Sequence, residues 1–353
     1  MLKRRSSRPP VVVGLDLDAS HVAAVEIAPD SPEIIRRSGL TMLRPGVIRD
    51  GEVVDPEALT KALTDLFGDN DLPTRVRVGI ANQRIVVRAM DVEPLLEGRD
   101  LYEAVHAQAA DHIPMPMDEA VLDFQALGMV ATPQGARRRV VIVAVRREVV
   151  ERLARAVSAA GLTIEGIDLS AFAMVRAVGH SGPGARLYVN VAGLTNVAVA
   201  GEEGVLFARA SAGGLDALTH ALAERRGLTL AHARQWMTHV GVSEPLAEVE
   251  GDPDLVAATR AVLEEGIHQI ADAIHSSVEY YRMQEDAARV DEGILCGPAV
   301  GIPGFADVLG EQLRLPLTAM VVDSAEGSEL TPEIGRLTVA AGLAVEERNS
   351  DSN

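Results

Sequence analysis

The sequence predicts an α/β protein made of two duplicated halves with a cleft between them. Its 353 residues exceed the ~100–200 residues of an ordinary domain, so we expect two domains. A strand–turn–strand–turn–strand pattern opens the chain at residues 11–42 and recurs at residues 187–210. The segment from His180 to Gly184 is rich in Gly and Pro and is the best linker in the chain. A repeat of this length indicates a duplicated domain, with chance similarity of two hairpins as the alternative.

In the first half, apolar runs and helix-capping residues define the expected elements. Asp55 suits the cap of a helix that has Pro56 at its first position. Gly161 suits the end of another helix. The expected strands span residues 11–17, 22–27, 33–42, 75–80, 85–90, 121–129, 137–145 and 162–168, and the expected helices span residues 56–67, 100–112, 148–160 and 170–178.

The second half repeats the opening strands and then becomes mainly helical. Its longest expected helix covers residues 253–283, where Leu263, Ile267, Ile270 and Ile274 recur at a spacing of three or four and form one apolar face. The other expected helices span residues 215–225, 231–240, 305–313 and 337–346, and the expected strands span residues 187–191, 196–200, 205–210 and 293–296.

Composition and charge exclude several classes of protein. The chain has 51 acidic and 33 basic residues and a formal net charge of −18, which disfavours a nucleic-acid-binding surface. Its single cysteine, Cys296, excludes a disulfide framework and a multi-cysteine zinc site, and we expect it in the core. No stretch approaches the ~18 apolar residues of a membrane span. Residues 1–10, which are basic, and residues 346–353 are expected to be flexible tails.

Three stretches resemble one known family, the PilM proteins, which are actin-like cytoplasmic proteins of the type IV pilus assembly platform. The first, Tyr102–Phe124, keeps two prolines at Pro114 and Pro116, then an Asp-Glu pair, then Leu-Asp followed by an aromatic residue. The second is the Glu-Tyr-Tyr-Arg sequence at residues 279–282. The third, at residues 294–305, is similar to the family's adenosine-binding loop, which ends in Leu-Pro-Gly. The resemblance extends from about residue 11 to residue 323.

The resemblance implies an actin-like fold, a duplicated RNase H-like α/β architecture with subdomains 1A, 1C, 2A and 2B around a central cleft. Residues 11–180 would form the first domain, with 1C inserted at about 80–145. Residues 185–345 would form the second domain, 2A, with 2B at about 215–280.

The resemblance also implies a nucleotide cleft, and tight turns such as those after the opening strands expose N–H groups that can bind anions. The first phosphate loop would include Asp16, Asp18, Ala19, Ser20 and His21, with Asp16 holding Mg²⁺ through water. Asp18 stands where the family has a turn glycine, although aspartate is also an ordinary turn residue.

The second phosphate loop and the adenosine loop would complete this cleft. Asn190 stands where the family has a second aspartate, although it could simply be a hydrogen-bonded amide at a strand end. The other cofactor-binding residues implied by the resemblance are Thr195, Gly213, Gly214, Gly297, Pro298 and Gly301.

The departures from the family pattern weaken the expected site. Loss of one carboxylate about 4 Å from a cation costs on the order of 4 kcal/mol at an effective dielectric of 20, and Asp18 adds a repulsive charge near the phosphates. We therefore expect weak binding of ATP or ADP with Mg²⁺, and no catalytic residue is identified.

A partner site is suggested by Ile113, Met115 and Met117, which alternate in a segment that Pro114 and Pro116 keep out of helix. They could pack as a core connection or form the wall of a peptide groove, where methionine supplies adaptable contacts. In the resembling family, the cytoplasmic N-terminal tail of the single-span membrane protein PilN docks between 1A and 1C.

Together these features favour an adaptor at the inner face of the cytoplasmic membrane that links a PilN-like protein to pilus motor ATPases, with its oligomeric state left open. The alternatives are an actin-like ATPase or small-molecule kinase, and a division-type actin homologue. The polar end of the chain does not suit the amphipathic membrane helix typical of the latter.

Overall fold

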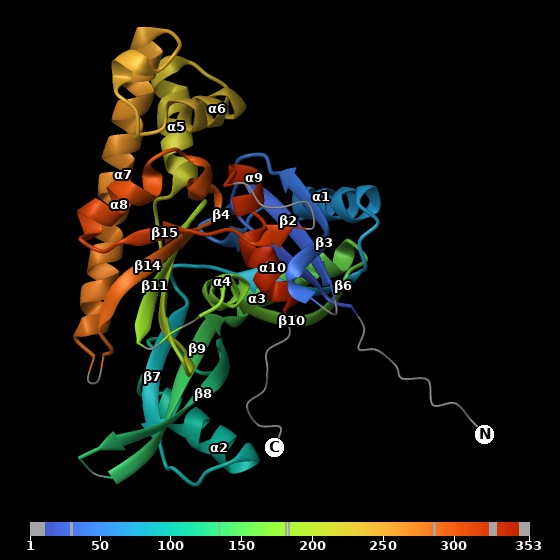
Figure 1. Cartoon of the computed structure of the whole chain (residues 1–353). Helices are drawn as coiled ribbons and strands as arrows, with labels where there is room; N and C mark the ends of the chain where they lie inside the picture. Colours follow the sequence, from blue (N-terminus) through green and yellow to red (C-terminus); the bar gives the residue numbers. More distant parts are fainter. Residues whose placement is uncertain are drawn as a thin grey trace.

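The computed structural model of the chain describes residues 11–28, 31–133, 135–180, 182, 184–284, 287–324 and 330–345 (Figure 1). The expected tails at 1–10 and 346–353 lie outside the described residues. In the described part, four sheets and their helices form the structure, one of the sheets being a two-stranded hairpin. None of the helices described has the length and apolar character of a membrane span.

The first sheet has six strands in the order β10-β6-β1-β2-β3-β16. It is packed with two pairs of helices, α1 against α3 and α4 against α10. Its elements are β1 (Val13–Leu17), β2 (His21–Ala28), β3 (Ser31–Met42), β6 (Arg75–Ile80), β10 (Thr163–Leu169), β16 (Asp323–Ser324), α1 (Pro56–Asp69), α3 (Arg147–Ala159), α4 (Ser170–Val178) and α10 (Thr338–Ala344). The short hairpin of β4 (Ile48–Arg49) and β5 (Glu52–Val53) precedes α1.

The second sheet has five strands in the order β13-β12-β11-β14-β15. In it, β11 pairs antiparallel with β12 and parallel with β14, just as β1 pairs antiparallel with β2 and parallel with β6. Its elements are β11 (Ala185–Val191), β12 (Thr195–Gly201), β13 (Gly204–Ser211), β14 (Val290–Cys296), β15 (Leu317–Ala319), α5 (Leu215–Arg226), α6 (Leu230–Val240), α7 (Pro253–Arg282) and α8 (Phe305–Leu313), with short turns of helix at η1 (Leu246–Glu248), η2 (Pro298–Gly301) and α9 (Pro332–Gly335). The repeated pairing gives the duplicated architecture that the sequence predicts.

A third, smaller sheet stands apart from the first two in Figure 1, at the end opposite α5, α6 and the far end of α7. Its strands are β7 (Val86–Val92), β9 (Gly135–Arg146) and β8 (Ala120–Thr132), in that order, and they carry α2 (Gly98–Ala109). Val105, Val140 and Ile142 are fully buried between this sheet and α2, so it has a core of its own.

The end of the chain returns to the first sheet, which corrects part of the predicted division into domains. The family resemblance implied a second domain at residues 185–345, but β16 pairs with β3 and α10 packs against β1 and α4. The approach is close because two glycines leave room for it. A Cβ on Gly14 would lie 1.8 Å from the Ala340 carbonyl oxygen, and one on Gly342 would lie 1.7 Å from that of Ala173. The apolar helix α10 is thus buried against the first sheet. The other predicted domain boundaries stay a prediction.

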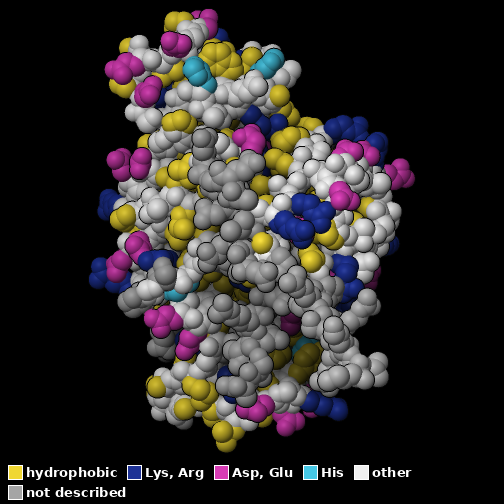
Figure 2. Space-filling model, turned by 45° about the vertical axis from the view of Figure 1, so that its right-hand side comes forward, with side chains coloured by type: hydrophobic (Ala, Val, Ile, Leu, Met, Phe, Trp, Pro, Cys, Tyr) yellow, Lys and Arg dark blue, Asp and Glu magenta, His cyan; other side chains and the backbone are white. Residues whose placement is uncertain are grey.

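Charged side chains of both signs are scattered over the face seen in Figure 2. On the face seen in Figure 2, the Lys and Arg side chains that the structure describes form small groups separated by acidic and uncharged ones. This distribution agrees with the net negative charge and gives no broad basic surface on that face.

Candidate functional site

Two turns face each other where β1 and β11 end. Residues 18–20 form the first turn, and residues 192–194 form the second. The backbone N–H of Gly193 donates a hydrogen bond of 2.9 Å to Asp18 Oδ2, so the turns are in direct contact. A Cβ on Gly193 would lie within 2.9 Å of both Asp18 carboxylate oxygens and of Ala19 Cβ. Glycine at this position therefore allows the two halves to meet.

The other oxygen of Asp18 is bonded within its own turn. Asp18 Oδ1 accepts hydrogen bonds of 3.1 Å from the backbone N–H and from the hydroxyl of Ser20, and His21 Nδ1 lies 3.3 Å away. Burial alone would raise the pKa of Asp18, but the charge of His21 and these hydrogen bonds outweigh it and lower the pKa to about 2. The carboxylate is therefore ionised at any physiological pH.

Asp16, the predicted Mg²⁺ ligand, lies at the end of β1 with 7% of its surface exposed. Burial raises its pKa to about 7, although His21 and a hydrogen bond from Ser170 act in the opposite direction. A cation would have to bind the ionised form, which this environment disfavours. Within the described residues, no three His, Cys, Asp or Glu side chains are grouped so that they could hold a metal ion.

Asn190, at the matching position of β11, is also buried. Its Oδ1 finds no hydrogen-bond partner among the described atoms, and a Cβ on Gly297 would lie only 1.8 Å from that oxygen. The amide is thus pressed against the loop that follows β14. A buried amide oxygen without a partner is costly, so the end of β11 is a polar site that packing alone does not explain.

A cavity of about 480 Å³ opens beside the two turns. Of the predicted cofactor-binding residues, Ser20 and Pro298 line it. Thr195 is buried and its hydroxyl donates to the carbonyl of Gly213, which holds the second turn against the start of α5. Gly214 lets this segment approach Ala192, because a Cβ there would lie 2.3 Å from the Ala192 carbonyl oxygen.

The remaining predicted glycines allow close packing of backbone. A Cβ on Gly301 would lie 2.1 Å from Pro332 Cδ, so η2 is covered by α9. Gly297 adopts a positive φ of 81°, and its carbonyl oxygen lies 2.2 Å from where a Cβ on Gly335 would stand. These contacts join the predicted adenosine loop to the part of the chain that returns to the first sheet.

The charged residues of this cavity are absent from the sequence prediction, and three of them are buried enough to matter for a ligand. Asp216, Arg234 and Arg336 line it together, and Arg234 Nη2 lies 3.9 Å from Asp216 Oδ1. Burial, together with the nearby charge of Asp18, raises the pKa of Asp216. The Nε atoms of both arginines are buried without a partner among the described atoms. Asp216 could have been suspected because it follows the Gly213–Gly214 pair, whereas no sequence signal pointed to Arg336.

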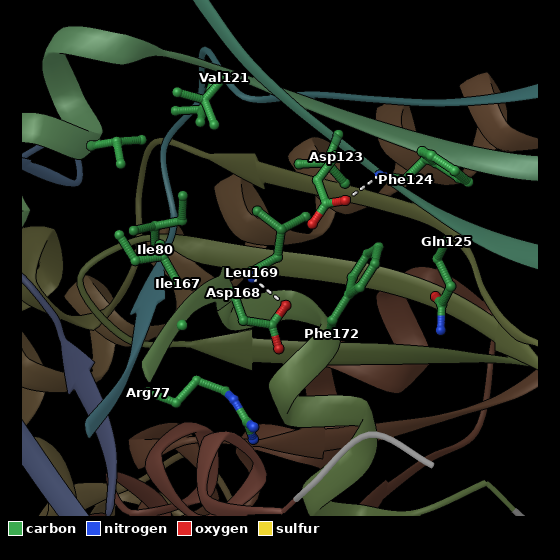
Figure 3. A pocket seen from close by; sticks show the side chains of 14 residues that line it. Arg77, Ile80, Val121, Asp123, Phe124, Gln125, Ile167, Asp168, Leu169 and Phe172 are labelled. Atoms are coloured by element: carbon green, nitrogen blue, oxygen red, sulfur yellow. Dashed lines mark hydrogen bonds between the residues drawn. The ribbon is translucent and has the colours of Figure 1, made fainter. Parts of the chain in front are cut away.

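A second cavity, of about 260 Å³, lies between the first and third sheets (Figure 3). Its lining residues come from β6, β10, α3 and α4 of the first sheet and its helices and from β8 and β9 of the third sheet. Its lining is mainly apolar and comprises Ile80, Val121, Phe124, Val143, Val145, Val150, Ile167, Leu169 and Phe172, with Arg77, Asp123, Gln125, Gly166 and Asp168 as the other members. We call this cavity the groove.

The charged side chains of the groove differ in their hydrogen-bond and ion-pair partners. Arg77 donates to the carbonyl oxygens of Leu343 and Val345, at 3.0 and 2.8 Å. Asp168 pairs with Arg176 and accepts the backbone N–H of Leu169. Asp123 is exposed and accepts the N–H of Phe124 at 2.8 Å. The Leu-Asp-Phe stretch of β8 carried part of the family resemblance, but no sequence signal assigned it to a groove.

The predicted partner-binding residues lie elsewhere, in the segment between α2 and β8. Ile113 is 6% exposed and belongs to the core of the third sheet, while Met115 and Met117 are half-buried against that core. The segment forms turns before β8, as shown by hydrogen bonds to the carbonyls of Pro116 and Met117. Its packing accounts for the three apolar side chains, and their role in partner binding stays a prediction.

Comparison with known proteins gives the same architecture. A solved structure described as a PilM–PilN type IV pilus biogenesis complex is similar over 96% of this chain and 98% of that one, with 23% identity and a TM-score of 0.77. The ethanolamine utilization protein EutJ from Carboxydothermus hydrogenoformans is similar over 96% and 91%, with 14% identity and a TM-score of 0.56. MreB5 of Spiroplasma citri bound to ADP is similar over 96% and 95%, with 12% identity and a TM-score of 0.55. These similarities establish the actin-like fold.

The sequence pattern of one family, described as type IV pilus assembly protein PilM, matches residues 14–348. This range includes both turns, the groove and the stretches on which the resemblance was based. The chain therefore belongs to the PilM family of type IV pilus assembly proteins.

Proposed function

We propose that the protein is an adaptor of the inner-membrane platform of a type IV pilus or a related secretion machine. It binds the cytoplasmic N-terminal tail of a PilN-like single-span membrane protein and couples it to the motor ATPases. Membership of the PilM family supports this role, as does the similar structure described as a PilM–PilN complex. Attachment to PilN would hold the protein at the cytoplasmic face of the inner membrane.

The observation that carries the proposal is the groove between the first and third sheets. Its lining is mainly apolar, and Val121, Phe124 and Ile167 are only half-buried, so a peptide that covered them would bury apolar surface. Two strands that border it, β10 and β8, are edge strands of their sheets in the described part of the chain. An edge strand offers backbone N–H and C=O groups to an extended peptide, which is a common mode of peptide recognition.

The charged side chains of the groove indicate which side chains the bound peptide should carry. Arg77 and Asp168 already bind groups of this chain, so they are less available to a ligand. Asp123 is exposed, and the hydrogen bond it makes among the described residues is to the neighbouring backbone N–H of Phe124, so it can accept an ammonium or guanidinium group. We therefore expect a tail whose apolar side chains enter the groove and which carries a basic group beside Asp123.

The proposal can be tested by filling the groove with a side chain. Gly166 lines the groove, and a Cβ there would make only ordinary contacts of 3.8 Å with Arg77. A leucine here can start its side chain without a close contact at Cβ, and the rest of that side chain would occupy space that the peptide needs. Gly68 is exposed, and a Cβ added to it would meet nothing within 4 Å, so Gly68→Leu is a matched control.

Binding of a synthetic peptide, made from the cytoplasmic tail of the PilN-like protein, would be measured by titration calorimetry. We expect Gly166→Leu to weaken binding by at least about tenfold, the equivalent of 1.4 kcal/mol, and Gly68→Leu to leave it unchanged. Equal binding by all three proteins would exclude the groove as the docking site. Failure of the unmodified protein to bind the tail would reject the adaptor proposal.

We also propose that nucleotide has at most a minor place in this function, with weak binding of ATP or ADP and Mg²⁺. The cavity beside the turns has room for an organic ligand, and one actin-like neighbour is described as bound to ADP. The donors of the turns, however, do not fit a polyphosphate, because Asp18 already occupies them. This proposal favours an adaptor over the ATPase and kinase alternatives.

A further inference from the structure

We propose that Asp18 is an internal substitute for phosphate, which fills the anion site formed by the two turns and joins the two halves of the chain without a nucleotide. This inference concerns the cleft and is independent of peptide binding in the groove. It makes Asp18 the residue that determines whether this cleft can accept a polyphosphate.

Hydrogen-bond donors from both halves of the chain converge on the Asp18 carboxylate. Ser20 supplies a backbone N–H and a hydroxyl, both at 3.1 Å, and the ring of His21 lies at 3.3 Å. Gly193, from the other half of the chain, supplies a backbone N–H at 2.9 Å. Backbone N–H groups that converge in successive turns form the usual binding site for a phosphate oxygen. Here the carboxylate of Asp18 already accepts hydrogen bonds from these donors.

Both oxygens of Asp18 lie within 2.9 Å of the position that a Cβ on Gly193 would take, so carboxylate and second turn are in contact. Ala19 Cβ lies at the same distance from that position, and the side chain of Asp18 is only 12% exposed. A phosphate group could reach the N–H of Gly193 only if the Asp18 side chain moved away and the turns separated.

The Asp18 carboxylate accepts hydrogen bonds from Ser20 and Gly193 and lies 3.3 Å from the ring of His21, and these contacts favour its charged form. A polyphosphate in the neighbouring cavity would therefore meet a like charge. The cavity itself stays open beside Ser20 and Ala192, so the obstacle is confined to the phosphate end of the site.

The test is a gain of binding when the internal anion is removed. Asp18→Gly opens the site, and Asp18→Asn keeps the shape of the side chain but removes its charge. The probe is Mg-ATP, titrated calorimetrically into the unmodified protein and both variants. From the repulsion between like charges about 4 Å apart at an effective dielectric of 20, we expect Asp18→Gly to bind on the order of 1,000-fold more tightly than the unmodified protein. Asp18→Asn should fall between the two.

A second measurement follows the contact between the halves. Hydrogen exchange of the Gly193 amide should be slow in the unmodified protein and at least about tenfold faster in Asp18→Gly, because its acceptor is lost. Mg-ATP should slow it again in the variant by supplying a new acceptor. Circular dichroism establishes that each variant is folded, and Asp18→Asn decides the question if Asp18→Gly does not fold.

Two results would overturn the proposal. One is tight binding of Mg-ATP to the unmodified protein, with no gain in either folded variant. The other is an unchanged exchange rate of the Gly193 amide when Asp18 is replaced. Neither result would affect the adaptor proposal, which is tested by peptide binding to the groove.

Discussion

Asp16 should make the protein less stable as the pH rises towards neutrality, and Asp16→Asn should remove this effect. The pKa of Asp16 is raised from its ordinary value of 3.8 to about 7, chiefly by burial. Between these two values the unfolded chain releases a proton that the folded protein keeps. The unfolded state therefore gains an advantage with each pH unit, and the folding free energy falls as the pH rises from about 4 to 7.

The size of the effect follows from the two pKa values. Each pH unit inside the window costs about 1.36 kcal/mol, so the whole difference corresponds to about 4 kcal/mol. Between pH 5 and pH 8 only the part from 5 to 7 contributes, which is about 3 kcal/mol. Asp18 has the opposite sign, because its lowered pKa contributes stability that is lost only as the pH falls through about 2. The interval from pH 5 to pH 8 thus isolates Asp16 from Asp18.

The assay is urea unfolding of the unmodified protein and Asp16→Asn at pH 5 and pH 8. Other titrating groups, including Asp216, are present in both proteins, so the difference between the two proteins reports on Asp16. We expect Asp16→Asn to gain stability relative to the unmodified protein by about 3 kcal/mol between the two pH values. A difference that is the same at both pH values would refute a raised pKa for Asp16 and with it the buried environment described for the end of β1.

Two further predictions concern the fold. Gly14→Ala should destabilise the protein by more than about 2 kcal/mol, because the added Cβ would collide with the Ala340 carbonyl oxygen and displace α10. Thermal melting of this variant is compared with that of the control Gly68→Ala. Equal melting temperatures for the two variants would contradict this packing. Asp252→Ala should cost about 1 kcal/mol in urea unfolding, because Asp252 caps α7 by accepting the N–H of Leu255 at 2.9 Å. The nearby exposed Asp254 makes no such bond to the helix end among the described contacts, so Asp254→Ala should cost roughly 0.3–0.5 kcal/mol. Equal losses of stability in Asp252→Ala and Asp254→Ala would reject the capping role of Asp252.

The sequence predicted those parts of the fold that depend on neighbouring residues. Asp55 accepts the N–H of Ala58 at 3.0 Å and caps α1, as its place before Pro56 indicated. Leu263, Ile267 and Ile274 are fully buried along α7, as their spacing indicated. In both cases the interaction lies within one helix or along one of its faces, so a short window of sequence contains the information.

Contacts between distant segments could not be predicted in this way. The return of α10 to β1 depends on two glycines, Gly14 and Gly342, which are unremarkable in their local sequence. The groove combines Arg77, Val145 and Phe172 with the edge of β8, and no single segment shows the pattern of a binding site. Its position is set by how the third sheet meets the first, which depends on long-range packing.

Asp18 shows why one residue can be partly predictable. Its hydrogen bond to the N–H of Ser20, two residues ahead, is the ordinary use of aspartate in a turn, and the sequence left that interpretation open. Its hydrogen bond to Gly193 spans 175 residues and appears only in the folded chain. The sequence therefore presented two alternatives, a simple turn residue or a charge that repels phosphate. Because the same carboxylate makes both hydrogen bonds, the two alternatives are not exclusive: Asp18 stabilises its turn, and by bonding to the second turn it also takes the place that a phosphate would need.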